Sequence, residues 1–242
     1  MTTNAKTDTP PTATARDTSS LDDSELYRGE TEFGSVVSYP DRVRLWGDGG
    51  YRGNCDGRLF LNLLLQYRPR TVADPMMGSG TTRDVVSGLN RHRQSPIEYW
   101  GGDLRSGFDL TTQPLPGKYD LVWVHPPYWN IIEYHSGPSD LSAVVDYADF
   151  LAELTACLSR CYDALNPGGR LAVLIADVRR RGRYYSLGND IMKLDGKLGQ
   201  LRSVIIKVQH NCRSDGKSYY QLEDPRIRHE YCVVFKRFSR DD

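Results

Sequence analysis

A short glycine loop between a strand-like and a helix-like segment constrains the fold of this chain most. Residues 71–73 (TVA) favour a strand, the loop DPMMGSG follows at 74–80, and residues 81–93 have the pattern of a helix. Glycine lets a backbone turn tightly and approach a ligand closely. A strand, a glycine loop and a helix in this order are typical of α/β folds that bind a ligand at the loop.

Strand-like and helix-like segments alternate along the rest of the chain. Helices are predicted between residues 51 and 69 and over 147–165, and strands at 97–101, 119–124, 170–176, 204–208 and 230–235. This alternation predicts an α/β fold with a mostly parallel sheet covered on both faces. The last two strands are expected to form an antiparallel hairpin at one edge of the sheet.

The length and composition suit one domain. Residues 1–33 are rich in Thr, Ser, Pro, Ala and Asp and predict a disordered tail, and residues 34–238 of the 242 predict a single domain. The chain contains no apolar run long enough to span a bilayer and no apolar secretion signal. The five cysteines form no C-x-x-C pair. We therefore expect a cytoplasmic protein without membrane contact, disulfide framework or metal site.

Acidic residues follow two of the predicted strands. Asp74 opens the glycine loop, and no lysine follows the second glycine, so the loop suits a ligand with cationic groups better than a polyphosphate. Asp103 can accept hydrogen bonds from two ribose hydroxyls. Asp109 can accept one from an adenine amino group, with Phe108 or Leu110 covering the ring. A structural turn and solvated loop aspartates would explain the same residues without a ligand.

A double-proline segment, HPPYW at residues 125–129, follows the predicted strand at 119–124. Two prolines fix the backbone and remove two N–H donors. They leave a rigid edge of carbonyl acceptors, which suits a planar group bearing an NH₂. Tyr128, together with Trp129, is expected to stack on that group.

The two loops together resemble those of the DNA amino-methyltransferases, which act on cytosine N4 or adenine N6. The family's cofactor loop has the form D-P-F-x-G-S-G-T-T, matched by residues 74–82 with Met76 in place of Phe. Its catalytic loop has the form [DNS]-P-P-[YF], matched by residues 125–128 with His125 in the first place. The run RHEYCVVFK at 228–236 is similar to a late H-E-Y strand in such enzymes. The resemblance covers roughly residues 38–237.

The resemblance implies a Rossmann-like class I methyltransferase fold, with S-adenosylmethionine as cofactor. It implies DNA as the partner, with RNA as an alternative. The protein is expected to be a monomer or a homodimer. It implies cofactor contacts from Asn54, Asp74, Pro75, Met76, Gly78, Ser79, Gly80, Thr81, Asp103, Asp109 and Leu110, and catalytic roles for His125, Pro126, Pro127 and Tyr128. The family has Asp, Asn or Ser where this chain has His125. Histidine can accept the target N–H only as neutral imidazole, and a strand-capping histidine is the structural alternative.

Basic and aromatic residues interleave late in the chain, over residues 178–228. From Val178 onward the chain has 15 Lys/Arg and 8 Asp/Glu, although the net charge of the whole is zero. Arginines beside aromatic rings suit phosphates and unstacked bases. The candidate substrate-binding residues are Trp129, Arg179, Arg180, Arg181, Arg183, Tyr184, Tyr185, Arg213 and Lys217. A solvated loop whose arginines pair with local acids is the structural alternative.

These features predict a methyltransferase for an exocyclic amino group of a DNA base. Cytosine N4 is favoured, since the Y-W continuation resembles the cytosine-N4 members most. The alternatives are an adenine-N6 DNA methyltransferase, an RNA or protein amide methyltransferase, and a catalytically silent nucleic-acid-binding module on the same fold. The histidine in the first position of the double-proline loop permits the last of these.

Overall fold

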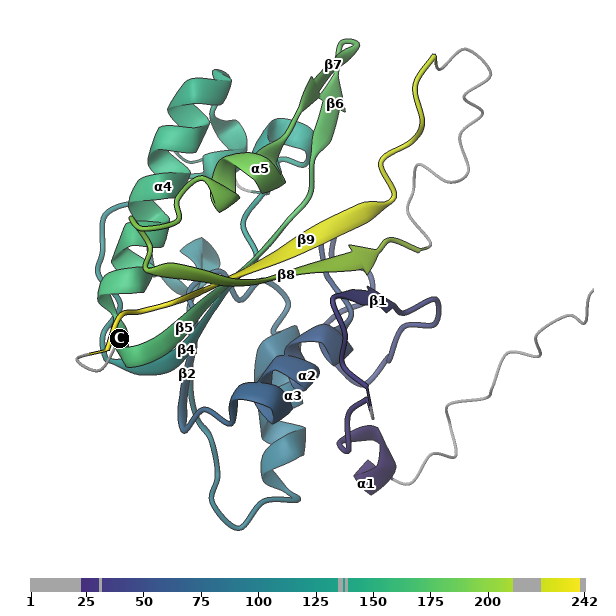
Figure 1. The fold of residues 1–242 in the computed structure, drawn as a ribbon, viewed down its shortest axis with the longest axis vertical. Coiled ribbons are helices and arrows are strands. Elements are labelled where there is room, and N and C mark those ends of the chain that lie inside the picture. The colour runs from purple at the N-terminus through teal and green to yellow at the C-terminus, as the bar shows by residue number, and fades with distance from the viewer. Residues whose placement is uncertain (1–22, 31, 135–136, 138, 211–222, 240–242) are drawn as a thin grey trace, which may run out of the picture.

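The fold is built on one seven-stranded sheet. A computed structural model describes residues 23–30, 32–134, 137, 139–210 and 223–239. The sheet has the order β1-β8-β9-β5-β4-β2-β3, and β9 runs antiparallel to both of its neighbours while the other pairs are parallel (Figure 1). The strands are β1 (Val36–Ser38), β2 (Thr71–Asp74), β3 (Glu98–Gly101), β4 (Tyr119–Val124), β5 (Leu165–Ile175), β8 (Gln200–Val208) and β9 (His229–Lys236). The predicted α/β class with a mostly parallel sheet is confirmed.

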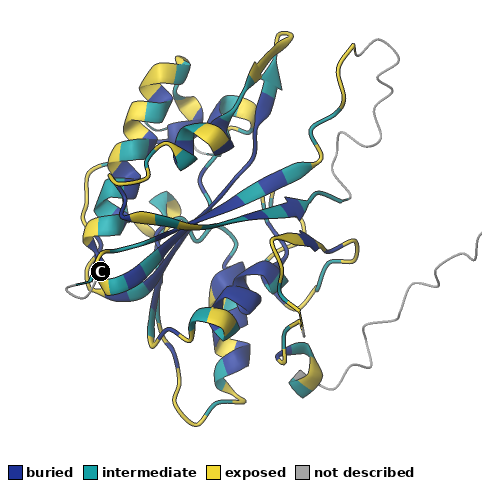
Figure 2. Cartoon of the chain, in the orientation of Figure 1, coloured by how far each residue is buried: buried dark blue, intermediate teal, exposed yellow. Residues whose placement is uncertain are grey.

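Helices cover both faces of this sheet. On one side lie α2 (Gly57–Tyr67) and α3 (Thr81–Asn90), and on the other lie α4 (Tyr147–Asp163) and α5 (Leu187–Met192) (Figure 1). Alternate residues of β4 point to opposite faces, so Trp123 belongs to the core beneath α2 and α3, while Val124 belongs to the core beneath α4 and α5. The central strands are buried along most of their length (Figure 2). Within the described ranges, no helix is both long and apolar enough to cross a membrane.

Two predictions about the ends of the chain need correction. The antiparallel pair β8–β9 forms as expected, but it lies one strand in from the edge, because β1 pairs in parallel with β8. The tail predicted for residues 1–33 is too long, because α1 (Asp23–Leu26) is helical and Tyr27 is buried. The Tyr27 hydroxyl accepts a hydrogen bond from the indole of Trp46 at 2.9 Å. Residues 1–22 lie outside the described part of the chain.

A second, two-stranded sheet follows β5, and the sequence analysis did not predict it. It consists of β6 (Val178–Arg180) and β7 (Arg183–Tyr185), which pair antiparallel and project from the body of the domain (Figure 1). The turn between them consists of Arg181 at φ 49° and Gly182 at φ 78°. Positive φ at both central residues is what a two-residue hairpin turn requires. This β6–β7 hairpin carries the four arginines of the VRRRGRYY segment.

Candidate active site

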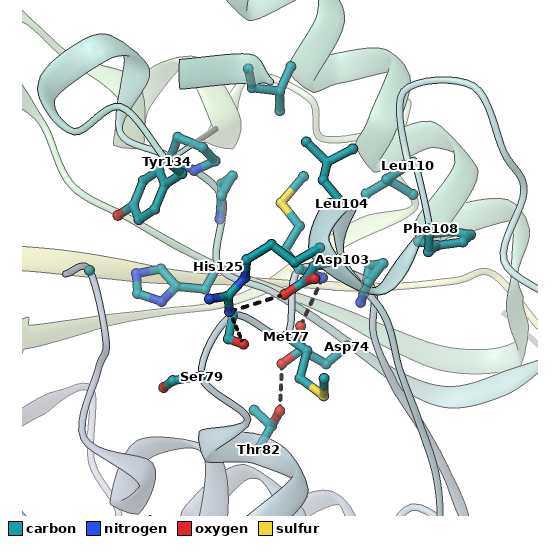
Figure 3. A pocket seen from close by; sticks show the side chains of 18 of the residues that line it. Asp74, Met77, Ser79, Thr82, Asp103, Leu104, Phe108, Leu110, His125 and Tyr134 are labelled. Carbon is teal, nitrogen blue, oxygen red and sulfur yellow. Dashed lines mark hydrogen bonds and ion pairs between the residues drawn. The ribbon is translucent and has the colours of Figure 1, made fainter. Parts of the chain in front are cut away.

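A cavity opens at the carboxyl ends of β2, β3 and β4. It encloses about 1000 Å³ including its open mouth. Because β3 lies on one side of β2 and β4 on the other, this is the point where α/β sheets of this type bind ligands. Most of the predicted site residues line it: Asn54, Asp74, Pro75, Met76, Gly78, Ser79, Thr81, Asp103, Asp109, Leu110, His125, Pro126 and Pro127 (Figure 3). Gly80, Tyr128 and Trp129 were also predicted to lie in the site, but they do not line the cavity.

The glycine loop takes its shape from two left-handed residues. Gly78 has φ 55° and Gly80 has φ 85°, a region that favours glycine. A Cβ atom on Gly78 would lie 3.0 Å from the ring of Tyr51, so any larger residue would crowd this wall of the cavity. Gly80 caps the start of α3 behind the cavity. Its role is therefore to shape the loop, which differs from the predicted ligand contact.

Asp74 holds this loop from within. One carboxylate oxygen accepts a hydrogen bond from the Met76 amide at 3.1 Å, and the other accepts from the Thr82 hydroxyl at 2.5 Å (Figure 3). Burial raises the pKa of Asp74 to about 7, even though both hydrogen bonds act in the opposite direction. Asp74 does line the cavity. However, both of its oxygens already have partners in the loop, so it holds the loop rather than being a free carboxylate that awaits a cation.

Asp103 begins a 3-10 turn (Leu104–Ser106) directly after β3. One carboxylate oxygen accepts from the Ser106 amide at 3.0 Å, and the other lies 3.6 Å from Arg105. The Arg105 guanidinium also donates to the Gly78 carbonyl at 2.5 Å and lies 4.7 Å from the centre of the Tyr51 ring. Arg105 thus links the two loops that border the cavity, and a ligand hydroxyl must compete with it for Asp103.

An apolar wall continues from Asp103. Leu104, Phe108 and Leu110 lie along this side of the cavity (Figure 3). The Phe108 ring packs edge-on against Trp100, with ring centroids 4.8 Å apart. The Asp109 carboxylate accepts from the Thr111 amide and hydroxyl at 2.8 and 2.6 Å. Because its own turn uses this carboxylate, the predicted hydrogen bond to an adenine amino group has less support than the apolar covering of a ring.

His125, directly after β4, is half-buried and begins a polar chain that leads to the buried residues Glu230 and Lys207. Its Nε2 lies 2.8 Å from the Tyr128 hydroxyl, which donates to Glu230 at 2.7 Å. The other Glu230 oxygen accepts from the Lys207 ammonium at 2.5 Å. Burial lowers the pKa of His125 to about 4; the Glu230 carboxylate opposes this shift and the Lys207 ammonium adds to it. His125 is therefore neutral at pH 7.

The predicted stacking role of Trp129 is wrong, whereas that of Tyr128 stays a prediction. The Tyr128 hydroxyl is bound inside the polar chain just described. Trp129 is only 5% exposed, donates to the Val144 carbonyl at 3.0 Å and packs against Tyr147 and Tyr185. Nothing local in the segment HPPYW distinguishes a buried ring from an exposed one. The ring beside His125 in the cavity is that of Tyr134, which was not predicted (Figure 3).

Other residues that line the cavity were not predicted as site residues. They are Tyr51, Gly53, Cys55, Met77, Thr82, Leu104, Arg105, Thr111, Trp123, Tyr134, Ser139 and Leu141. Phe108 was noted only as a cover for a ring. Most of the others lie in loops without a recognisable motif. Met77 and Thr82 lie within the glycine-loop motif, but the residues outside the two motifs are separated from them along the chain, which gave no reason to place them together.

The four arginines of the β6–β7 hairpin divide into two pairs. Arg179 lies 3.6 Å from Asp224, and Arg180 lies over the Trp129 ring and donates to the Asn130 carbonyl at 3.3 Å. These two hold the β6–β7 hairpin to the domain. Arg181 and Arg183 are exposed, and the Arg183 guanidinium lies 5.0 Å from the centre of the Tyr185 ring.

The remaining substrate candidates fall into three groups. Tyr184 is 43% exposed and donates to Asp177 at 2.6 Å, so its ring is accessible although its hydroxyl is occupied. Tyr185 packs against Tyr147 and Trp129, which differs from the predicted substrate contact. Arg213 and Lys217 lie outside the described residues.

The topology is that of a Rossmann-like class I methyltransferase fold, with one antiparallel strand inserted between two parallel ones. No protein-family model and no curated protein sequence matches the chain. Among solved structures, the chain is similar to TTHA0409 from Thermus thermophilus, provisionally assigned as a DNA modification methylase and complexed with S-adenosyl-L-methionine. The identity is 30% and the TM-score 0.37, over 54% of this chain and 51% of that one. The chain thus spans about half the length of that protein.

Two further solved structures are similar at lower identity. TrmN from Thermus thermophilus is 20% identical with a TM-score of 0.44, over 76% of this chain and 50% of that one. An S-adenosylmethionine-dependent methyltransferase from Clostridium acetobutylicum is 13% identical with a TM-score of 0.43, over 79% of this chain and 94% of that one.

Proposed function

We propose that this protein transfers a methyl group from S-adenosylmethionine to an exocyclic amino group of a base in nucleic acid, with cytosine N4 of DNA as the first candidate. One observation supports this proposal above the others. A neutral histidine followed by two prolines lines the same cavity as the glycine loop and Asp103. This arrangement provides hydrogen-bond acceptors for an NH₂ group beside a site that suits a nucleoside.

The cavity residues fit such a cofactor. Asp103 offers a carboxylate for ribose hydroxyls, and Leu104 and Phe108 offer an apolar wall for the adenine ring. Gly78 keeps the glycine-loop wall of the cavity free of a side chain, because a Cβ atom there would lie 3.0 Å from the ring of Tyr51. When bound, S-adenosylmethionine supplies an activated methyl group, and the role of the chain is to hold the acceptor nitrogen in line with it.

His125 and the proline pair would orient the target amino group. The lone pair of a base amino nitrogen is delocalised into the ring, so the nitrogen is a poor nucleophile. Acceptors on both N–H groups favour a more tetrahedral nitrogen with an available lone pair. The neutral imidazole of His125 provides one acceptor, and the Pro126 carbonyl is our candidate for the other.

The β6–β7 hairpin is our candidate contact for the nucleic acid. Arg181 and Arg183 are exposed on it, and Tyr184 presents an accessible ring. Exposed arginines beside an aromatic ring suit phosphates and an unstacked base. A target in duplex DNA must be flipped out of the stack before it can reach the cavity.

The class of substrate is tested by methyl transfer from labelled cofactor to DNA, RNA and a protein extract in parallel. Label in DNA, followed by mass spectrometry of the nucleosides, is expected to give N4-methylcytosine. Detection of N6-methyladenine would show that the target base is adenine and not cytosine. Label in RNA would show that the substrate is RNA and not DNA. Cofactor binding without transfer to any of the three would contradict the enzymatic proposal and support the silent binding module.

Replacing Asp103 with Ala is expected to weaken S-adenosylmethionine binding about tenfold. A hydrogen bond to a charged group contributes about 1.5 kcal/mol or more, and the variant loses this acceptor for the ribose. Calorimetry on the wild type and the variant measures the effect. Asp149→Ala, an exposed aspartate in the first turn of α4, is the matched control. Equal affinity in all three proteins would remove Asp103 from the cofactor site.

Replacing Arg181 and Arg183 with Gln is expected to weaken nucleic-acid binding and to flatten its salt dependence. If each arginine meets one phosphate of a duplex, the slope of log K against log salt falls by about 1.8. Lys197→Gln/Arg202→Gln removes the same charge near the start of β8, at the opposite end of the sheet, and serves as control. An unchanged slope in the hairpin variant would show that these arginines do not contact phosphate.

A further inference from the structure

A buried ion pair lies behind His125, outside the lining of the cavity. Lys207 on β8 and Glu230 on β9 face each other across the two strands, and they are only 8% and 7% exposed. Burying such a pair is costly, and a well-packed apolar pair is often as stable or more so. Lys207 uses one of the two Glu230 oxygens. The other accepts from Tyr128, and this bond leads to His125.

The ion pair fixes the direction of the hydrogen bonds in this chain. Burial alone would raise the pKa of Glu230, but the Lys207 ammonium and the other partners outweigh it and lower that pKa. An ionised carboxylate can only accept hydrogen bonds. Tyr128 must therefore give its single hydroxyl proton to Glu230. The hydroxyl oxygen then faces Nε2 of His125 as an acceptor, so Nε2 must carry a hydrogen.

The opposite arrangement is unfavourable. If Nε2 of His125 carried the lone pair, Tyr128 would have to turn its proton away from Glu230. Two oxygen atoms, one of them charged, would then face each other at 2.7 Å without a hydrogen between them. A protonated imidazole is excluded at neutral pH by the lowered pKa of His125. Of the three forms of the ring, only the neutral Nε2–H tautomer both donates to Tyr128 and is present at neutral pH.

We propose that Lys207, Glu230 and Tyr128 are positioning residues that hold His125 in its Nε2–H tautomer, so that Nδ1 presents the lone pair to the substrate amino group. The last clause rests on the proposed function. Among the described residues, Nδ1 has no hydrogen-bond partner, while the histidine itself lines the cavity. An Asp, Asn or Ser side chain in this position needs no such help, because an oxygen acceptor has no tautomer to fix.

Nitrogen NMR of histidine-labelled protein tests the tautomer without any substrate. The chain has five histidines, and the His125→Asn variant identifies the His125 signal. The wild type is expected to show a neutral Nε2–H ring throughout about pH 5.5–8, a range that spans the unperturbed imidazole pKa. Tyr128→Phe removes the hydroxyl acceptor and is expected to produce a mixture of tautomers. An Nδ1–H ring in the wild type, or an unchanged ring in the variant, would overturn the proposal.

Other titratable groups near the polar chain could also affect the His125 signal, so they determine which control is needed. Cys55 and Tyr134 also interact electrostatically with Tyr128, and burial raises both of their pKa values to about 12, so both stay neutral over the test range. Tyr231→Phe is the matched control. Its hydroxyl lies on the same strand as Glu230 but is bound to His229 and Asp177. This variant should leave the His125 signal as in the wild type.

A rate measurement separates the positioning role from the proposed reaction. Tyr128→Phe is expected to lower the single-turnover rate about tenfold, or about 1.4 kcal/mol, with cofactor affinity and the Tyr231→Phe rate unchanged. If the wild type holds the Nε2–H tautomer but methylates no substrate, the proposed function is contradicted, while the proposal that the polar chain fixes the tautomer is still supported. If the wild type methylates and Tyr128→Phe changes neither tautomer nor rate, the positioning role is overturned.

Discussion

Replacing Lys207 with Met is expected to lower the free energy of unfolding by about 3–5 kcal/mol at pH 7. The substitution keeps an unbranched side chain that is one atom shorter, and it leaves the buried Glu230 carboxylate without its ammonium partner, which is the costly way to break a buried ion pair. Denaturant titration with a two-state fit measures the change. Lys193→Met is the matched control, because Lys193 forms an exposed ion pair with Asp190 at 3.0 Å. That pair should contribute less than about 1 kcal/mol.

The loss of unfolding free energy in Lys207→Met should also depend on pH. In the wild type the pKa of Glu230 is lowered, so its contribution is present above the unfolded pKa and is lost as pH falls through the folded pKa. In Lys207→Met, the buried Glu230 has no ammonium beside it, so its pKa should rise. Protonation of Glu230 in acid then removes the unpaired buried charge that destabilises the variant. The difference between variant and wild type should therefore shrink from pH 7 to about pH 5. A small loss that does not change with pH would contradict an ionised pair at this position.

The sequence predicted best what depends on neighbours along the chain. The runs that became β2, β4 and β9 are apolar and bounded by polar residues, so period and turn signals were sufficient. The two loops at the cavity follow strands directly, and the carboxyl ends of parallel strands meet at one edge. For this reason Asp74, Asp103 and His125 could be placed in one site before the structure was known.

The predictions that failed concern contacts between residues that lie far apart in the sequence. Tyr128 and Glu230 are 102 residues apart, so nothing near Tyr128 indicates that its hydroxyl is already bound. Trp129 was expected to be exposed because a proline turn usually is, yet the β6–β7 hairpin and α4 bury it. The arginines of that hairpin look alike in sequence. Only the fold shows that Arg180 is held against Trp129 while Arg181 is exposed to solvent.

The histidine is also where the structure changes the expected pH dependence. An unperturbed imidazole titrates near pH 6.5, which predicted a fall in methyl transfer at mildly acidic pH. Burial lowers the pKa of His125 to about 4, so the ring stays neutral well below pH 6.5. The part of the rate that depends on His125 should therefore be constant from about pH 8 down to about pH 5.5 and should fall only nearer pH 4, while Asp74 on the glycine loop, with a pKa of about 7, titrates within this range.

Replacing His125 with Ala is expected to lower the single-turnover rate by about 100-fold, the size seen when one positioned hydrogen-bonding group is lost from an active site. His125→Asn restores an acceptor that does not titrate in this range, and it should recover part of the rate and abolish the fall near pH 4. Both variants should bind S-adenosylmethionine as the wild type does. His229→Ala is the control, since that ring bonds to Tyr231 on β9. If His125 only caps β4, the Ala variant should instead melt at lower temperature with its rate intact, and that result would remove His125 from the chemistry.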